Sequence, residues 1–530
     1  MTADLRADVR RIVPLAWPVF IGQVAVLGFG TVDTVLVARH SPTDLAALAV
    51  GGATYITVFI GLMGVVLAIS PIVGQLYGAQ RLREAGHQVW QGLWLALALA
   101  ALGSTLLVFP APFLALAQAS PAVAAKVRGY LLALAFALPA SLLFTVYRGF
   151  NIAVSRPKAV MVLQLGGLVL KVPLSMALVS GLPALGIPAL GVEGCGIATL
   201  IAMWLQALLA WAWMRRDPFY HRFELAAPGQ RALHAGSLRA LLRLGVPIGL
   251  SILVEVTGFA FMAIFISRMG EIAVAGHQIA ANLVSLLFMM PMGLANATST
   301  LVAQRIGAGD LRDARRLGWH GMQFAGMLAL LVGCAVFAAR EQVLRLYTDN
   351  PAVVAAALPL LAWVALFHTV DAVQTVAGFV LRAWRIATAP MLIFVGALWG
   401  VGLGGGYALA FGGLAGVPAG WRGAPGFWIA STTGLSLTAV ALTALLAWVL
   451  SRQRGAQEAT DRAAPTRVDM SIMRSRALPT SARLTGEGCA AGGCCAWGRG
   501  AGGCWTWVCR GAGTASLRST GGGSCTRGWD

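Results

Sequence analysis

Charged residues are scarce in this chain. Only 11% of its 530 residues are Asp, Glu, Lys or Arg, 58% are hydrophobic, and the mean hydropathy is +0.76. A soluble domain carries roughly 25% charged residues, because fewer cannot cover its surface. This shortage excludes a soluble fold for most of the chain and predicts that lipid is its solvent.

Metal-binding and catalytic signatures are also scarce. None of the eight cysteines sits in a CxxC pair; Cys195 and Cys334 are isolated, and the other six lie between Cys489 and Cys525. Two paired cysteines are what a zinc site would need. There is no P-loop, dinucleotide-binding glycine turn or HExxH motif. The sequence therefore predicts no resident cofactor, no metal centre and no enzyme.

Long hydrophobic runs fill the chain instead. A membrane span needs ~20 apolar residues in helical form, and a spanning strand would be a much shorter alternating segment. We therefore predict an all-α integral membrane protein with twelve transmembrane helices. The predicted runs are residues 12–38, 48–72, 88–113, 128–150, 159–182, 194–214, 244–267, 275–303, 318–340, 353–381, 388–412 and 426–450.

The basic residues are unevenly divided between the two sides that this topology defines. The side of the N-terminus collects 23 Lys and Arg, and the opposite side collects 7. Cytoplasmic loops carry the excess of basic residues, so both termini are predicted to be cytoplasmic. The net charge of +19 lies in these short clusters rather than on a basic domain, which argues against a nucleic-acid partner.

The two halves of the hydrophobic part repeat each other. Polar and special residues match at a separation of 229 positions, which becomes 230 further along, and chance would align Leu, Ala and Val instead. The repeat predicts two six-helix bundles of the same orientation, a parallel repeat with a substrate path between the halves. Matching residues are Pro18 and Pro247, Arg39 and Arg268, Gln75 and Gln304, Gly78 and Gly307, Arg83 and Arg312, and Trp90 and Trp319.

The predicted domains follow from the repeat. They are an N-terminal lobe over 1–215, a cytoplasmic connector over 216–243 and a C-terminal lobe over 244–452. Residues 453–530 are predicted to be a disordered tail, because they are rich in Gly, Arg, Cys and Ser without periodicity. Their composition suggests a GC-rich reading frame translated out of register, so that this tail would not be native.

Four charged residues fall well inside the predicted spans: Asp33, Lys171, Glu255 and Asp371. A charge at mid-bilayer costs at least ~2.5–3.5 kcal/mol, so such residues mark ion or substrate pathways. The alternative is a salt bridge that only joins helices, and Asp33 with Lys171 is the natural pair. Burial favours protonation of a carboxyl group, and its oxygens also suit Na⁺, so Glu255 and Asp371 are predicted to couple transport to H⁺ or Na⁺. Polar residues near these charges extend the predicted site: Gln278, Asn282 and Gln374.

Five segments together resemble the multidrug and toxic compound extrusion (MATE) transporters, in the NorM-like bacterial branch. They are Thr-Val-Asp-Thr at 31–34, Val-Gly-Gln-Leu-Tyr-Gly-Ala at 73–79, Gly-Val-Glu-Gly-Cys-Gly-Ile-Ala at 191–198, Gly-His-Gln-Ile-Ala at 276–280 and Asp-Ala-Val-Gln at 371–374. The resemblance covers roughly residues 10–450. It implies a two-lobed exporter of organic cations and other drugs, with a cation site on Glu255 and Asp371 and an N-lobe acid at Asp33. Lys171 departs from the Asn usual in relatives.

The sequence thus predicts a Na⁺- or H⁺-coupled multidrug antiporter, monomeric in a bacterial inner membrane, with cationic, amphipathic drugs as substrates. Other functions stay open. A lipid-linked oligosaccharide flippase would need a strongly basic cavity, whereas three acids and one base lie inside the predicted spans. An intramembrane aspartyl protease is less favoured, and a receptor or scaffold would leave the buried charges idle.

Overall fold

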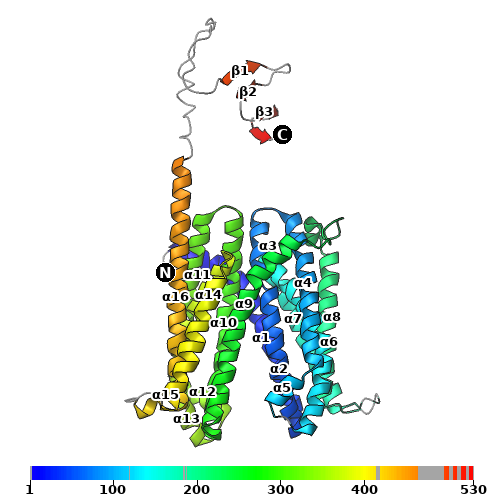
Figure 1. Cartoon of the computed structure of the whole chain (residues 1–530), viewed down its shortest axis with the longest axis vertical. Coiled ribbons are helices and arrows are strands. Elements are labelled where there is room, and N and C mark those ends of the chain that lie inside the picture. Colours follow the sequence, from blue (N-terminus) through cyan, green and yellow to red (C-terminus); the bar gives the residue numbers. More distant parts are fainter. Residues whose placement is uncertain are drawn as a thin grey trace. The chain divides into compact units, whose positions relative to one another are not determined.

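The computed structural model describes residues 3–118, 120–182, 186, 188–412 and 418–463, together with four short segments between 495 and 528. Among these residues are twelve helices, or runs of two or three consecutive helices, that are long and apolar enough to cross a membrane. They stand side by side as two bundles (Figure 1). The predicted fold class, an all-α membrane protein with twelve spans in two bundles, is confirmed.

The N-terminal bundle contains the elements up to the connector. They are α1 (Ala3–His40), α2 (Pro42–Val66), α3 (Ile69–Gly78), α4 (Leu82–Val108), α5 (Ala111–Leu116), α6 (Pro121–Ala153), α7 (Pro157–Ser180), α8 (Val192–Arg216) and the short 3-10 helix η2 (Pro218–Phe223). The second span consists of α2 and α3, which are interrupted at Leu67 and Ala68.

The C-terminal bundle repeats this order of spans. Its elements are α9 (Ala235–Ser267), α10 (Glu271–Gly307), α11 (Leu311–Ala338), α12 (Arg340–Tyr347), α13 (Pro351–Ala383), α14 (Thr388–Phe394), the π-helix η3 (Val395–Gly404), α15 (Gly405–Ala410), the 3-10 helix η4 (Ala419–Trp421) and α16 (Ala424–Ala463). The helix α9 begins inside the range predicted for the connector. The eleventh span is α14, η3 and α15 in succession.

The first helix of each bundle crosses into the other bundle. Ile12 of α1 is buried in the core of the C-terminal bundle, and Leu241 of α9 is buried in the core of the N-terminal bundle. These two residues are related by the 229-residue repeat, so the exchange is reciprocal. The predicted boundaries at 215 and 244 therefore divide the chain more sharply than the packing does.

The bundles meet at the end that carries the connector, which we call the connector end. Gln75 on α3 donates a hydrogen bond to the carbonyl oxygen of Ala383, 2.7 Å away, and Gln304 on α10 donates one of the same length to Ala153. Gln304 also donates to the Ser155 hydroxyl at 2.8 Å. Gln75 and Gln304 are repeat equivalents, as are Ala153 and Ala383. The two contacts are thus related by a pseudo-two-fold axis, as the parallel repeat predicts.

Two glycines permit this close approach. A β-carbon on Gly78 would overlap the backbone carbonyl of Gln304, and one on Gly307 would overlap that of Gln75. The backbones of α3 and α10 therefore come into direct contact, and the small residues let the glutamine side chains reach across. Removal of a side chain is the usual means of bringing two membrane helices this close.

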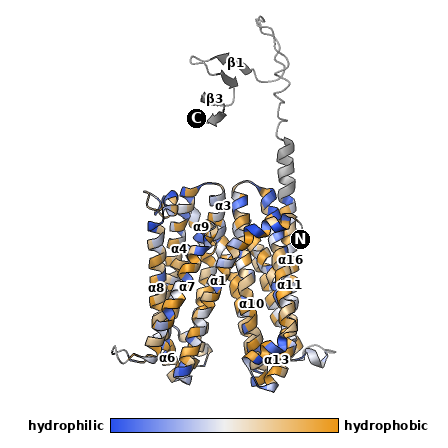
Figure 2. Cartoon of the chain, turned by 180° about the vertical axis from the view of Figure 1, so that it is seen from behind, coloured by the Kyte–Doolittle hydropathy of each residue, from blue (hydrophilic) through white to orange (hydrophobic). Residues whose placement is uncertain are grey.

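The outer surface of the helical unit is apolar (Figure 2). Val169, Leu331 and Val440 are 72%, 68% and 68% exposed. Exposed aliphatic side chains at this density would be unfavourable in water, but they match the hydrocarbon core of a bilayer, in which the helices satisfy their own backbone hydrogen bonds. The protein is therefore a multi-pass membrane protein.

The tail differs from its prediction in the part that the structure describes. The helix α16 continues to Ala463, past the predicted start of disorder at 453, because Gln, Ala, Glu and Arg in this segment favour helix. Four strands follow: β1 (Cys495–Arg499), β2 (Trp505–Cys509), β3 (Ala515–Thr520) and β4 (Ser524–Gly528). They pair antiparallel in the order β1-β2-β3-β4. The rest of the predicted tail lies outside the described residues.

We expect a methyl group at Gly78 to destabilise the contact between the bundles. The Gly78→Ala variant should lower the free energy of unfolding by about 1–3 kcal/mol, since an added carbon atom at a packed contact forces the backbone to move. Thermal unfolding in detergent measures this. Gly52→Ala is the matched control, because Gly52 is also helical and has open space around it. Equal melting temperatures for the two variants would contradict the assigned contact.

Candidate functional site

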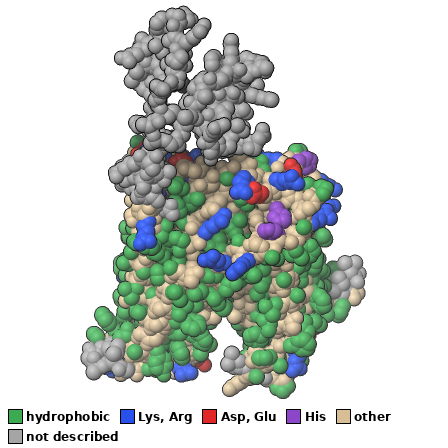
Figure 3. Space-filling model, turned by 45° about the horizontal axis from the view of Figure 1, so that its top comes forward, with side chains coloured by type: hydrophobic (Ala, Val, Ile, Leu, Met, Phe, Trp, Pro, Cys, Tyr) green, Lys and Arg blue, Asp and Glu red, His purple; other side chains and the backbone are tan. Residues whose placement is uncertain are grey.

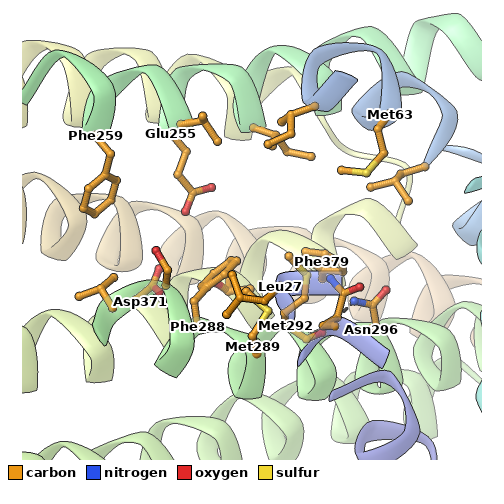
Figure 4. Close-up of a pocket in the computed structure, with 18 of the residues that line it drawn as sticks. Leu27, Met63, Glu255, Phe259, Phe288, Met289, Met292, Asn296, Asp371 and Phe379 are labelled. Carbon is orange, nitrogen blue, oxygen red and sulfur yellow. Dashed lines mark hydrogen bonds between the residues drawn. The ribbon is translucent and has the colours of Figure 1, made fainter. Parts of the chain in front are cut away.

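A cavity of about 620 Å³ lies between the two bundles. Its walls come from both repeats, including α1, α2 and α6 from the first and α9, α10 and α13 from the second. Most of the lining is apolar, with Phe259, Phe288, Met289 and Met292 prominent (Figure 4). Such a cavity suits a large, flat or flexible ligand that is itself mostly apolar.

Glu255 enters the cavity from α9. The side chain is partly exposed, and it makes no hydrogen bond or ion pair with any described residue. Its backbone is held by the eleventh span, because the indole of Trp399 donates a hydrogen bond to the carbonyl of the preceding Val254 at 3.1 Å. Trp399 belongs to the π-helix η3, and a π-helical turn of this kind is frequent at functional sites.

Asp371 enters the same cavity from α13 and is only 3% exposed. Gln374, one helical turn along, donates a hydrogen bond to its Oδ1 at 2.9 Å. Figure 4 shows the carboxyl groups of Glu255 and Asp371 pointing toward one another across the cavity. No described Lys, Arg or His lies within ion-pair distance of either group. Two ionised carboxylates in this position repel each other, and a bound proton or monovalent cation would relieve the repulsion.

The other predicted polar residues divide into two groups. Gln278 and Gln374 line the cavity, as does the buried His277. Asn282 is not among the lining residues; its side-chain oxygen accepts a hydrogen bond from the Tyr347 hydroxyl at 3.0 Å. The contact with Tyr347 at the end of α12 occupies this oxygen, and the role predicted for Asn282 in the site stays a prediction.

Asp33 and Lys171 form a buried ion pair, as predicted. The Lys171 ammonium lies 2.6 Å from the Asp33 carboxylate, donates to the Thr199 hydroxyl at 2.9 Å and is 4.9 Å from the centroid of the Phe29 ring. Neither charged residue lines the central cavity. The geometry therefore separates this pair from the acidic pair of the C-terminal bundle, and its two charges neutralise each other inside the N-terminal bundle.

Two cavity residues were missed by sequence reasoning. Arg148 on α6 and Arg382 on α13 both line the cavity, although their positions near span ends placed them among the loop charges. The prediction of three acids and one base inside the spans is accordingly incomplete. Extending the helical periodicity of each span to its last turns could have found them. Both residues lie inside their helices, at most about one and a half turns of 3.6 residues before the end.

An intramembrane aspartyl protease would carry its catalytic aspartate in a Gly-x-Gly-Asp sequence, and such a sequence occurs once in the chain, at Gly307–Asp310. Its aspartate lies in the exposed turn between α10 and α11, where the carboxylate accepts a hydrogen bond from the backbone N–H of Asp313 at 3.0 Å. Asp310 thus caps a helix at the connector end, and this location does not suit an intramembrane catalytic group.

Two pseudo-symmetric bundles of six spans around a central cavity with facing carboxyl groups define a secondary membrane transporter by fold and site. Comparison with known proteins agrees with this class. The profile of the MatE family matches residues 18–177 and 247–408, which begin at the repeat equivalents Pro18 and Pro247. The chain belongs to the MatE family.

Named relatives place the chain in the NorM-like branch, as predicted. It is 39% identical over 445 residues to the probable multidrug resistance protein NorM of Aromatoleum aromaticum, with 83% of this chain and 94% of the relative covered. It is 35% identical over 444 residues to the multidrug resistance protein PmpM of Pseudomonas aeruginosa, with 84% and 92% covered. The fold matches the bent form of the Vibrio cholerae MATE transporter VcmN at a TM-score of 0.75, with 18% identity and 85% and 99% covered.

The Asp33–Lys171 pair generates a stability prediction. The Lys171→Met variant leaves a buried carboxylate without its cation and should lose about 3–5 kcal/mol of unfolding free energy. Adding Asp33→Asn should recover much of that loss, because the unpaired charge is then removed. Thermal unfolding of both variants in detergent measures the effect. Lys158→Met is the control, since Lys158 is an exposed lysine of the same helix; equal stability of the Lys158 and Lys171 variants would refute the prediction.

Proposed function

We propose that this chain exports amphipathic drugs across a bacterial inner membrane, in exchange for inward-moving H⁺ or Na⁺. The observation that carries the proposal is the pair Glu255 and Asp371, which face each other in an apolar cavity between two lobes. The names of the relatives support drugs as the exported ligands. We further propose that the protein acts as a monomer, since the cavity is lined within one chain.

Competition for the acidic pair is sufficient to couple the two movements. A cationic ligand that binds between Glu255 and Asp371 neutralises the charge that a coupling H⁺ or Na⁺ would otherwise neutralise. Binding of the ion therefore releases the ligand, and binding of the ligand releases the ion. Because each state favours a different occupant, the ion gradient drives the ligand in the opposite direction. Gln374 supports this role by fixing the orientation of the Asp371 carboxylate.

The direction of transport follows from the proposed orientation. Lys and Arg side chains gather around the connector end (Figure 3), which the positive-inside rule assigns to the cytoplasm together with both termini. The contacts of Gln75 and Gln304 close the same end. The notch between the bundles at the opposite end (Figure 3) then faces outward. In this state the acidic pair would receive the ion and release the drug.

A flippase for lipid-linked oligosaccharides fits the cavity less well. A pyrophosphate-linked lipid carries several negative charges and requires a strongly basic site. Here the cavity is lined by as many carboxyl groups, those of Glu255 and Asp371, as arginines, so it is not strongly basic. The proposal of drug export therefore stands ahead of this alternative.

Neutralising the acidic pair should abolish coupled transport. The Glu255→Gln, Asp371→Asn double variant, reconstituted in proteoliposomes, should show no drug movement above background under an imposed pH or Na⁺ gradient, because no charge remains for ion and drug to share. Fluorescent-drug flux under each gradient measures this, and the wild-type response identifies the ion.

The matched control is Glu271→Gln, which changes an exposed glutamate in the first turn of α10. It should transport like the wild type. The proposal fails if the double variant retains gradient-driven flux while its amount in the membrane equals that of the control.

A further inference from the structure

The two arginines of the cavity, Arg148 and Arg382, have no carboxylate of a described residue within ion-pair distance. The Arg148 guanidinium donates to Gln23 Oε1 at 3.2 Å and contacts the sulfur of Met63 at 3.5 Å. The Arg382 guanidinium lies 4.4 Å from the centroid of the Phe379 ring and makes no hydrogen bond to a described residue.

Guanidinium N–H donors without acceptors inside the cavity favour binding of a ligand that supplies them. An arginine carries five N–H donors and cannot lose its charge, so its burial away from anions is unfavourable unless the group faces a cavity. Arg148 uses its donors on one amide oxygen and one weak sulfur acceptor. Arg382 rests on an aromatic face and leaves its donors available. A planar carboxylate matches this fork of donors in two parallel hydrogen bonds.

The groups that the arginines contact and the acidic pair lie toward different ends of the cavity, although Arg382 still interacts electrostatically with Glu255 over a longer distance than an ion pair. In Figure 4, Glu255, Asp371 and Phe259 lie at one end, and Met63 and Phe379 at the other. Arg148 contacts Met63, and Arg382 lies over Phe379. Asp371 and Arg382 are both on α13, where eleven residues correspond to about 16 Å at ~1.5 Å per residue. The apolar side chains of Phe288, Met289 and Met292 lie between the two ends.

The charges of the cavity balance when all four groups are ionised. Two carboxylates and two guanidinium groups sum to zero, so a ligand with a single positive charge satisfies the acidic pair but leaves the positive charge of the arginines uncompensated in an apolar enclosure. A ligand with one cationic and one anionic end keeps the balance and gives each end a partner of opposite sign. Such a ligand fits the cavity better than a simple cation of the same size.

We propose that Arg148 and Arg382 form a carboxylate subsite, so that the cavity selects amphipathic zwitterions whose cationic end lies at Glu255 and Asp371. The inference rests on the proposed function, which assigns the acidic pair to a cationic ligand group. It extends that function, since it makes the arginine end determine which drugs are preferred.

Binding of a matched pair of probes tests the subsite. The probes are ω-aminododecanoic acid, a zwitterion with an apolar middle, and its methyl ester, which keeps the ammonium and removes the negative charge. Titration calorimetry on the purified full chain in detergent should show the acid binding at least tenfold more tightly than the ester. The Arg148→Gln and Arg382→Gln variants should each lose roughly 10- to 100-fold in affinity for the acid, and less than about threefold for the ester.

Control variants separate this inference from the proposed function. Arg239→Gln changes an exposed arginine on α9 outside the cavity and should leave both affinities unchanged. Glu255→Gln should weaken acid and ester alike. If the wild type binds the ester and transports drugs but does not favour the acid, the subsite is wrong while the function stands. If neither probe binds and no gradient-driven flux occurs, the proposed function itself fails.

Lysine variants and a competing lipid test the subsite further. Should a glutamine variant fail to fold, Arg148→Lys and Arg382→Lys keep the charge but lose the planar fork, and they should give a smaller loss of acid affinity at unchanged ester affinity. Phosphatidylglycerol offers a phosphate to the same arginines. If added phosphatidylglycerol abolishes the tighter binding of the acid over the ester, and the acid does not compete with the lipid, a lipid phosphate occupies the subsite. That outcome overturns the proposal.

Discussion

Direct contact of two helix backbones at the connector end is the constraint on which the rest of the structure depends. Gly78 and Gly307 remove the side chains that would hold α3 and α10 apart, so Gln75 and Gln304 can each reach a carbonyl of the opposite bundle. Because the contact is reciprocal, it fixes a pseudo-two-fold axis through the molecule. The cavity follows from it, since bundles joined at one end enclose a space where they diverge.

The sequence was sufficient for the architecture because a bilayer leaves few choices. Hydrophobic runs, helical by necessity, and a repeat in register gave twelve spans in two bundles of the same orientation. It also singled out Glu255 and Asp371, since a carboxyl group inside an apolar run has few structural explanations. The pairing of Asp33 with Lys171 was predictable for the same reason, because they are the charged residues that fall well inside the predicted spans of the N-terminal half.

What the sequence could not supply was the direction of side chains near helix ends. Arg148 and Arg382 read as loop charges, because hydropathy cannot distinguish an arginine that faces water from one that faces a cavity. Nor did the sequence indicate that the side-chain oxygen of Asn282, one turn from Gln278, accepts a hydrogen bond from Tyr347. The crossing of α1 and α9 between the bundles was also not predictable, because the hydrophobic pattern of a span does not identify its neighbours.

The repeat preserves the fold but not the charges. Position 255 corresponds to Val26 in the first half and position 371 to Ser141, while Asp33 corresponds to Met262 and Lys171 to Val401. Two equivalent bundles thus hold charge differently: one contains a cation and an anion in contact, and the other contains two anions that face a cavity. The charges of Asp33 and Lys171 neutralise each other without a bound ion. Two facing carboxylates repel each other, and a bound cation or proton would reduce that repulsion. The structural symmetry of the bundles is therefore not matched by chemical symmetry, and the proposed ion site belongs to the C-terminal bundle alone.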